Sequence, residues 1–271
     1  MQEIEPFETK KSLGQHFLTS DIVPKWMCEA SDIQAGETIL EVGPGTGILT
    51  KELLALGARV IALEADIRAV DVLKESFKSE IESGQLMLHH TDVREFDITK
   101  YSLTHQGFKV VSNIPYYLSG MLFRLFLQSD IQPSHLVFLV QKEVAQRIAK
   151  STKESLLSLS VKVFGEPKYM QTVTKGHFAP PPKIDSAIIS VEHISNDNFK
   201  KISQKLFFDS IRIGFGQKRK QLLGNLSKTY DRTALTNIFS TLSLPPDIRA
   251  EDLTLEKWLT LVDALQNINN T

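Results

Sequence analysis

Apolar and polar residues follow a repeating order of strand-like and helix-like patterns along the first two thirds of the chain. Short apolar runs predict strands near residues 38–42, 59–64, 86–90, 109–113 and 135–140. Amphipathic spacing predicts helices between them, near residues 48–56, 66–79, 119–128 and 142–150. This alternation of strands and helices is typical of an α/β fold with a parallel, doubly wound sheet.

The pattern changes in the last third of the chain. A helix-like segment at 155–165 precedes two late strands, Tyr169–Val173 and Ala187–Val191, which we expect to pair antiparallel at the sheet edge. Strand patterns end after Asp197, and helices are predicted near residues 198–212, 218–227, 232–242 and 255–267. We therefore predict two domains. Residues 1–195 would form a seven-stranded, mostly parallel sheet with helices on both faces, and residues 196–271 a small all-helical domain.

A glycine-rich turn follows the first predicted strand of the sheet. Residues 41–47 read EVGPGTG, and a helix begins at Ile48, where a dinucleotide-binding turn would carry its third glycine. The pattern suits S-adenosylmethionine, which presents an ammonium and a carboxylate rather than a pyrophosphate. Glu41 would order the loop or attract the ammonium, while the helix N-terminus favours the carboxylate. A helix at 22–33 is expected to cover this site.

Two acidic residues follow the next two predicted strands. Glu64 ends the second strand, 17 residues after Gly47, and Asp92 follows the third. A carboxylate at the position of Glu64 can accept hydrogen bonds from both ribose hydroxyls of a nucleoside cofactor. Asp92 can accept one from the amine of the cofactor's adenine. Their position beside a glycine turn favours ligand contacts over ordinary surface residues.

The fourth predicted strand ends in the sequence SNIPYY, residues 112–117. Asn113 can accept a hydrogen bond from an adenine amine and so localise the nitrogen lone pair for methyl transfer. Pro115 fixes the backbone and leaves local carbonyls free. Tyr116 offers a ring on which an extruded base can stack. Phe178, in the loop between the late strands, is interpreted as the opposite aromatic wall of the target pocket.

Composition narrows the cellular context. The chain has 271 residues, 42% of them hydrophobic, and one cysteine, Cys28, which excludes an internal disulfide and is expected to be buried and inert. No apolar stretch approaches the length of a membrane span, and the first residues lack a signal-peptide core, so we predict a cytoplasmic protein. Five histidines show no ligand spacing with cysteines or acids, and no metal is predicted: His89, His90, His135, His177 and His193.

The charge is unevenly distributed. The net charge is only −1, but residues 200–232 hold nine basic and two acidic residues, so this segment carries +7 and the remainder −8. Such a concentration favours contact with phosphates. The predicted RNA-binding residues are Arg212, Lys218, Arg219 and Lys220. Lys10 and Lys11 form a second, smaller basic cluster, and the balancing negative charge favours a monomer.

Four motifs together resemble one family, the small-subunit ribosomal RNA adenine dimethyltransferases. They are KSLGQHFL at 11–18, EVGPGTG at 41–47, NIPY at 113–116 and FAPPPKIDSA at 178–187. The resemblance implies a Rossmann-like class I S-adenosylmethionine-dependent methyltransferase fold. It also implies dimethylation of two adjacent adenosines in a hairpin loop near the 3′ end of the small-subunit RNA. The cofactor contacts it implies are His16, Leu18, Gly43, Glu64, Asp92 and Asn113, with His16 standing where many members have asparagine.

Four alternatives stay open at this point. A large-subunit dimethyltransferase of the macrolide-resistance type would use the same chemistry, but the stretch LGQHFL at 13–18 and the basic segment favour the small subunit. A DNA adenine methyltransferase would more usually carry an acid at Asn113, and a nicotinamide dehydrogenase would carry a third glycine at Ile48. The last alternative is a non-catalytic assembly factor that binds the immature small subunit.

Overall fold

The structure is a computed structural model that describes residues 16–217 and 219–269. The chain forms two compact units, one made of residues up to 145 together with 167–194, the other of residues 146–166 and 195 onward. The predicted division at 195 left residues 146–166 in the first domain, and here the structure differs. No helix among the described residues is long and apolar enough to cross a membrane.

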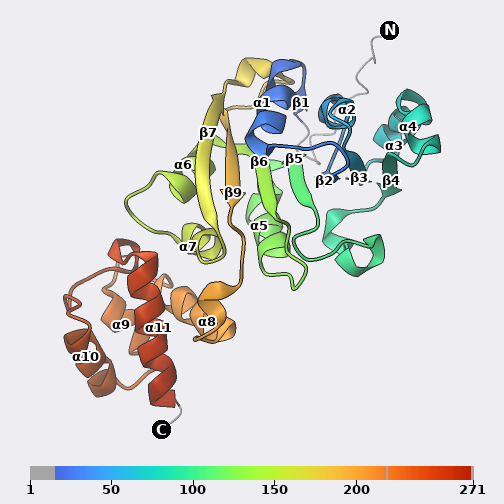
Figure 1. The fold of residues 1–271 in the computed structure, drawn as a ribbon. Coiled ribbons are helices and arrows are strands. Elements are labelled where there is room, and N and C mark those ends of the chain that lie inside the picture. The colour runs from blue at the N-terminus through green and yellow to red at the C-terminus, as the bar shows by residue number, and fades with distance from the viewer. Residues whose placement is uncertain (1–15, 218, 270–271) are drawn as a thin grey trace. The chain divides into compact units, whose positions relative to one another are not determined.

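The first unit is built on a seven-stranded sheet with the order β4-β3-β2-β5-β6-β9-β7. The strands are β2 (Thr38–Val42), β3 (Arg59–Glu64), β4 (Leu86–His90), β5 (Lys109–Asn113), β6 (His135–Gln141), β7 (Glu166–Val173) and β9 (Ser186–Glu192). The pairs from β4 to β6 are parallel, whereas β9 runs antiparallel to β6. The predicted seven-stranded, mostly parallel sheet is confirmed (Figure 1).

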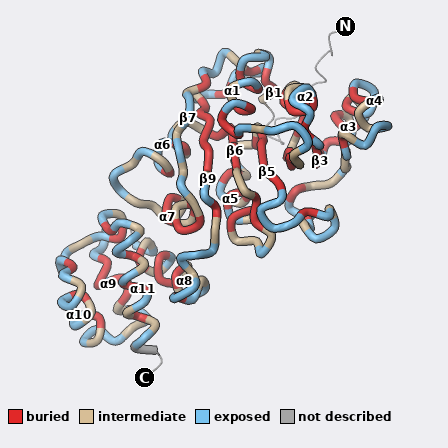
Figure 2. Tube along the Cα trace, viewed as in Figure 1, coloured by how far each residue is buried: buried red, intermediate tan, exposed pale blue. Residues whose placement is uncertain are grey.

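Helices cover both faces of this sheet because its strands are apolar on both sides. Val137 and Phe138 are adjacent in β6 and point to opposite faces, and both are fully buried. The Val137 side packs with α1 (Ile22–Ser31) and α2 (Ile48–Ala55), and the Phe138 ring contacts Phe123 and Phe126 of α5 (Ser119–Leu127). Figure 2 shows the resulting buried strands and exposed outer helix surfaces. Helix α6 spans Lys142–Ala149, and the division between the two units falls within it, after residue 145.

The single helix predicted at 66–79 is interrupted in the structure. It forms α3 (Ile67–Ser76) and α4 (Lys78–Glu82), separated by Phe77, whose backbone leaves the helical conformation at φ −119°. The Phe77 ring is buried against the glycine turn, since a β-carbon placed on Gly47 would lie 2.5 Å from it. This long-range contact explains a break that the helical pattern did not predict.

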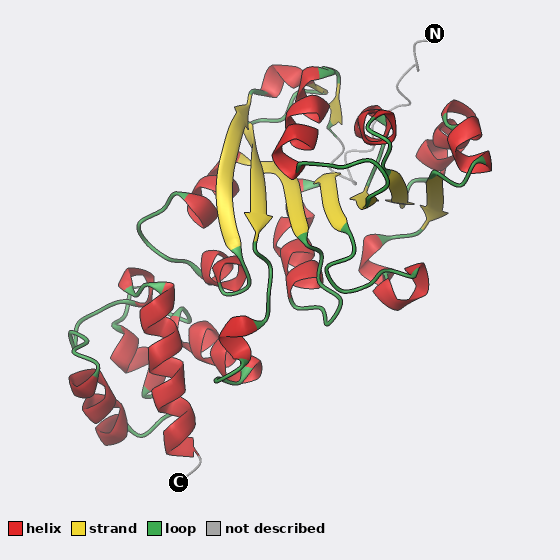
Figure 3. Cartoon of the chain, in the orientation of Figure 1, coloured by secondary structure: helices red, strands yellow, loops and turns green. Residues whose placement is uncertain are grey.

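The regular elements of the second unit are helices (Figure 3). They are α7 (Leu156–Lys162), α8 (Gln204–Gly214), α9 (Leu222–Leu226), α10 (Arg232–Thr241) and α11 (Leu255–Asn269). Trp258 is fully buried in their core, close enough to Gly214 that any side chain there would clash with its ring. The predicted helices at 198–212 and 218–227 both begin later than expected, at Gln204 and Leu222, respectively.

Contacts within the second unit explain why residues 146–166 belong to it. The Phe164 ring lies 5.3 Å from the ring of Phe199, and the Asn198 amide donates to the Val163 carbonyl at 2.7 Å. The Lys153 ammonium also forms an ion pair with Glu251 at 2.7 Å. These aromatic and ionic contacts join segments that are distant in sequence, which a helix pattern read along the chain does not reveal.

Candidate functional site

The carboxyl ends of the parallel strands bring the candidate residues to one edge of the sheet. Gly43 directly follows β2, Glu64 ends β3, Asp92 lies two residues beyond β4, and Asn113 ends β5. One pocket is formed there, and its lining includes all nine predicted catalytic and cofactor-binding residues. These are His16, Leu18, Gly43, Glu64, Asp92, Asn113, Pro115, Tyr116 and Phe178. Ligands of open α/β sheets bind at this edge.

The glycine turn gives the pocket an open backbone wall. Gly43 has φ +69°, a left-handed conformation that disfavours a side chain, and a β-carbon placed on it would meet no atom within 4 Å. Gly47 also has a positive φ of +81°, but its space is filled by Phe77 and Leu73. Gly43 therefore leaves room for a ligand against the backbone, whereas Gly47 serves close packing.

Glu64 is held in place by backbone donors on both of its oxygens. The Gly45 N–H donates to Oε2 at 3.0 Å and the Asp66 N–H donates to Oε1 at 2.9 Å. Burial raises the pKa of the Glu64 carboxyl, and the backbone hydrogen bonds oppose that shift. The backbone therefore fixes the orientation of this carboxyl group in the pocket lining, where its oxygens can accept from a ligand hydroxyl.

Glu41 orders the turn from inside the protein. It is 1% exposed, and its Oε2 accepts a hydrogen bond from the Thr50 hydroxyl of α2 at 2.7 Å. Burial raises the pKa of Glu41 to about 8, although the Thr50 hydrogen bond acts in the opposite direction. Of the two roles considered from the sequence, the structure supports loop ordering, because this carboxyl is tied to the helix that follows the turn.

Asp92 already has a cationic partner. Arg94 forms an ion pair with the Asp92 carboxylate at 2.5 Å and also donates its backbone N–H at 2.9 Å. The Arg94 guanidinium holds the pKa of Asp92 below its ordinary value. Arg94 and the exposed Tyr117 also line the pocket, and the sequence analysis missed both. Arg94 lies two residues after Asp92 and Tyr117 directly follows Tyr116, and this proximity in the sequence could have identified both.

Asn113 and Pro115 lie at the end of β5 and in the turn that follows it, and both line the pocket. The neighbouring Ser112 hydroxyl accepts a hydrogen bond from the Val42 N–H at 2.7 Å, which ties β5 to β2 beside the pocket. No intramolecular hydrogen bond of the Asn113 amide is found within the described part of the chain. The sequence suggested that the carbonyls near Pro115 are free. In the structure, however, the Pro115 carbonyl accepts a hydrogen bond from the Leu118 N–H at 2.9 Å.

Tyr116 is held at both its ring and its hydroxyl. The ring stacks with His16, with centroids 5.9 Å apart and planes inclined by 26°. The hydroxyl shares a hydrogen bond with the Ser186 hydroxyl at 2.6 Å. Burial raises the pKa of the Tyr116 phenol, and the hydrogen bond with Ser186 opposes that shift. The ring therefore has a defined orientation at the pocket wall.

A two-stranded sheet carries the opposite aromatic residue. Strand β1 (Phe17–Leu18) pairs antiparallel with β8 (Phe178–Ala179), placing Leu18 opposite Phe178. Phe178 is only 4% exposed and packs into the core beneath α1 while also lining the pocket. The Phe178 ring, predicted as a pocket wall, therefore belongs both to the hydrophobic core and to the pocket lining.

Comparison with known proteins identifies the family. A model of the ribosomal RNA adenine dimethylase family matches residues 6–267. This chain is a member of that family. A protein of Dehalococcoides mccartyi named ribosomal RNA small subunit methyltransferase A is 36% identical over 264 residues, covering 96% of this chain and 90% of the relative. A protein of the same name from Fusobacterium nucleatum is 35% identical over 261 residues, covering 94% and 97%, respectively.

A solved structure shows the same fold as this dimethylase. The crystal structure of a dimethyladenosine transferase from Plasmodium falciparum superposes with a TM-score of 0.78 at 23% identity, covering 94% of this chain and 98% of that one. The Rossmann-like methyltransferase fold implied by the motifs is thereby confirmed. The family resemblance drawn from those motifs is confirmed as well.

The basic segment of this dimethylase contains cations of two kinds. Three of them pair with nearby acids: Lys200 with Asp197 at 2.8 Å, Lys205 with Asp209 at 2.7 Å and Arg212 with Asp209 at 2.5 Å. Arg212 is thus a weaker candidate for phosphate contact than its charge indicates. The paired cations lie on or just before α8.

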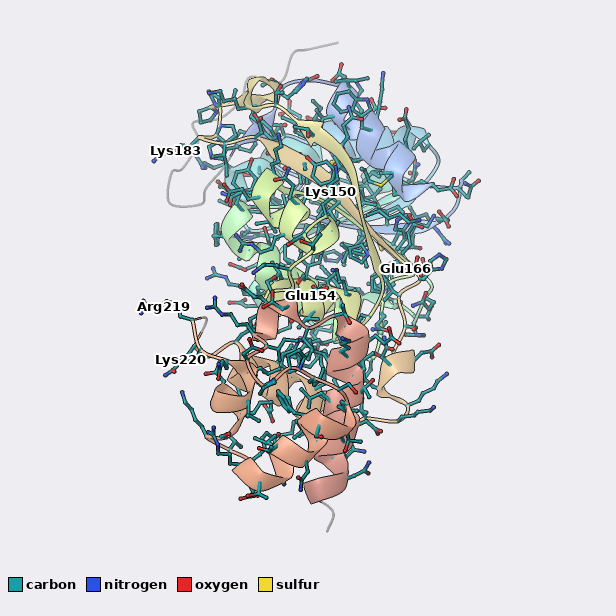
Figure 4. The ribbon with its side chains drawn as sticks, turned by 90° about the vertical axis from the view of Figure 1, so that its left-hand side faces the viewer. Lys150, Glu154, Glu166, Lys183, Arg219 and Lys220 are labelled. Carbon is teal, nitrogen blue, oxygen red and sulfur yellow. The ribbon has the colours of Figure 1, made fainter. Side chains whose placement is uncertain are left out.

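The loop between α8 and α9 carries two of the cations for which no ion pair is found in the described part of the chain. Arg219 and Lys220 are exposed, no ion pair of either is found among the described residues, and both side chains extend away from the helices (Figure 4). The buried Asn225 anchors the loop, with its amide donating to the Gly214 carbonyl at 2.7 Å and the Gln217 carbonyl at 3.2 Å. Lys218, Lys10 and Lys11 lie outside the described residues.

The remaining sequence predictions concern Cys28 and metals. Cys28 is buried in α1 as expected, and burial raises the pKa of its thiol to about 12, which keeps it protonated. Across residues 16–217 and 219–269, no group of three or more histidine, cysteine or acidic side chains is arranged to hold a metal ion.

Proposed function

We propose that this protein transfers methyl groups from S-adenosylmethionine to the 6-amino groups of two adjacent adenosines in a hairpin loop near the 3′ end of small-subunit ribosomal RNA. The observation that carries the proposal is the shared pocket: Asn113, Pro115 and Tyr116 line the same cavity as Gly43 and Glu64. A base-binding motif and a nucleoside-binding motif in one cavity allow a methyl donor and an adenine to meet. Family membership and the names of the relatives support the substrate.

The residues of the pocket fit S-adenosylmethionine, which supplies the electrophilic methyl group. Gly43 offers backbone with no side chain in the way, and Glu64 presents two fixed oxygens for the ribose hydroxyls. Asp92 would accept from the adenine amine of the donor, on a carboxylate now shared with Arg94. His16 and Leu18 would close the site from β1, and Asn113 would contact both donor and target.

The target adenine would bind between Tyr116 and Phe178, with Asn113 accepting a hydrogen bond from its amine. That hydrogen bond and one to a nearby backbone carbonyl strengthen as the nitrogen becomes tetrahedral, which stabilises the transition state for direct, in-line transfer. The enzyme forms no covalent intermediate. A general base is unnecessary because the ammonium product is acidic enough to release its proton to solvent.

Two rounds of transfer place a constraint on the pocket. The monomethylated amine has one N–H left, so the second round proceeds with one hydrogen bond fewer to Asn113 and the backbone. Stacking and shape must then hold the base. This is consistent with a pocket whose lining includes the aromatic rings of Tyr116 and Phe178 but only one side-chain amide, that of Asn113.

The helical unit would bind the ribosomal RNA. Arg219 and Lys220, held on a loop anchored by buried Asn225, are suited to contact phosphates, and Lys218 is a further candidate from the sequence. We propose that Arg212 contributes less because of its pairing with Asp209. The protein would act as a monomer in the cytoplasm on the small subunit, during subunit biogenesis.

One methyl-acceptor assay tests the proposal. Purified protein and labelled S-adenosylmethionine are incubated with unmethylated small subunits, large subunits or DNA, and the labelled nucleosides are identified after digestion. We expect dimethyladenosine in the small-subunit RNA only. Label in large-subunit RNA would support the macrolide-resistance type instead. Tight binding to small subunits without any label would support a non-catalytic assembly factor.

A further inference from the structure

The hydrogen bond between Tyr116 and Ser186 joins two residues that are 70 positions apart in the sequence. Ser186 is the first residue of β9, is fully buried, and lies opposite Gln141 at the end of β6. We propose that Ser186 is a positioning residue: it holds the Tyr116 ring in the orientation that stacks on the target base, and it thereby determines whether the second methyl group is added. This inference rests on the proposed function.

The geometry leaves the Tyr116 ring little freedom. Its backbone is fixed in a 3-10 turn (Tyr116–Leu118) directly after Pro115, and its hydroxyl is fixed by Ser186 at 2.6 Å. His16 lies along the ring and is itself held by a contact of 2.8 Å between its Nδ1 and the Pro180 carbonyl oxygen. A tyrosine whose hydroxyl bonds to a fully buried strand residue cannot swing without leaving two hydroxyls unpaired.

The second round of transfer depends most on this orientation. Unmodified adenine offers two N–H donors, whereas the monomethylated base offers one and is bulkier. With fewer hydrogen bonds to place it, the monomethylated base relies more on the stacking surface for its position. A Tyr116 ring released from Ser186 should therefore slow the second transfer more than the first, and monomethyladenosine should accumulate.

Ser190 provides a matched control on the same strand. It is also fully buried, its side chain is on the same side of β9 as that of Ser186, and its hydroxyl lies 2.7 Å from Nε2 of His135. It is not among the residues that line the pocket. The Ser190 hydroxyl also donates to Oε1 of Glu192 at 3.3 Å, so Ser190→Ala removes at least as much hydrogen bonding as Ser186→Ala without releasing Tyr116.

The test measures both methylation products over time. Wild type, Ser186→Ala, Tyr116→Phe, the double variant and Ser190→Ala are incubated with unmethylated small subunits and S-adenosylmethionine. Monomethyl- and dimethyladenosine are quantified by mass spectrometry, and S-adenosylmethionine affinity is measured by calorimetry. We expect Ser186→Ala and Tyr116→Phe each to slow the second transfer about tenfold, the size typical of one lost buried hydrogen bond, and the first transfer less.

The double variant and the controls decide the interpretation. We expect the double variant to resemble either single variant, because each removes the same hydrogen bond. Ser190→Ala should follow the wild-type time course, and all variants should keep wild-type affinity for S-adenosylmethionine. Equal slowing of both transfers, additive effects in the double variant, or monomethyladenosine accumulation in Ser190→Ala would overturn the inference. If the wild-type protein methylates no adenosine, the proposed function fails, and this inference fails with it.

Discussion

The pocket and the basic segment were both predicted from the sequence. The structure brings the predicted pocket residues together but divides the basic residues into two groups. The nine pocket residues come together in one cavity. The basic residues of 200–232, in contrast, divide into paired cations such as Lys205 and Arg212 and unpaired ones such as Arg219. For Glu64, Asp92 and Asn113 the first prediction used positions relative to strand ends, and for His16 and Leu18 it used the family resemblance. The second prediction used only a count of charges.

The difference has a physical cause. In a parallel sheet the carboxyl ends of all strands meet at one edge, so a residue at a strand end is placed by the backbone itself. A lysine or arginine side chain is long and flexible and takes whichever acid lies within reach. Asp209, one turn away from both Lys205 and Arg212, reduces the charge that this part of α8 presents to solvent. A count of basic residues therefore overstates the positive charge available to phosphates unless local ion pairs are taken into account.

The largest effect is expected from Asn113→Ala. Loss of the acceptor for the target amine should lower turnover about 100- to 1,000-fold, as when one preorganised transition-state hydrogen bond is removed. Single-turnover methylation of small subunits at saturating S-adenosylmethionine measures this loss, and the melting temperature is the control for folding, because Asn113 is also expected to contact the cofactor. A folded variant with normal turnover would show that Asn113 does not contact the reacting amine.

The next effect is on cofactor affinity. Glu64→Ala should weaken S-adenosylmethionine binding by about 1–3 kcal/mol, because two ribose hydroxyls lose their acceptor. Glu37→Ala is the matched control, since Glu37 is a carboxylate near the opposite end of β2 that pairs with Lys109 at 2.8 Å. Calorimetry should detect a loss only in the Glu64 variant. Equal affinities in both variants would remove Glu64 from the cofactor site.

These pocket predictions show which parts of the molecule a sequence can reveal. The strands β2 to β6 and the ends that carry Glu64 and Asn113 were predicted correctly because apolar runs and glycine turns are local signals. The break at Phe77 and the hydrogen bond from Tyr116 to Ser186 were not predicted. Both depend on contacts between residues far apart in the chain, which no local pattern encodes.

A third prediction concerns the buried carboxyl of Glu41. Its pKa is raised from 4.5 to about 8 in the folded protein, so between these values the folded state keeps a proton that the unfolded chain releases. Stability from this group is fully present below pH 4.5 and is lost as pH rises through 8. Glu41→Gln keeps an acceptor for Thr50 but cannot ionise.

Urea denaturation of both proteins across this pH range measures the effect. Relative to Glu41→Gln, the free energy of unfolding of the wild type should fall with rising pH, by up to about 1.4 kcal/mol per pH unit. Groups that do not interact with Glu41 cancel in the difference, whereas the repulsion between Glu41 and Glu64 is present only in the wild type and is part of the measured effect. Parallel pH profiles would mean that Glu41 is ionised throughout, and its proposed role in ordering the turn would then need a charged partner.

The smallest effect tests the basic segment and returns to the contrast with the pocket. Two double variants each remove two positive charges from 200–232: Arg219→Ser with Lys220→Ser, and Lys205→Ser with Arg212→Ser. Arg219 and Lys220 are exposed and form no ion pair among the described residues, so their loss should weaken binding to small subunits roughly tenfold. It should also reduce the salt slope, the dependence of log affinity on log salt concentration, by about two. The second pair is already neutralised in part by Asp209, so its loss should change the slope by less than half as much.

Sedimentation of protein with small subunits at several salt concentrations measures both slopes. Affinity for S-adenosylmethionine should be the same in all proteins, because the pocket belongs to the other unit. Equal losses in the two variants would show that total charge, not local pairing, determines RNA binding, and the distinction drawn between the pocket and the basic segment would then fail.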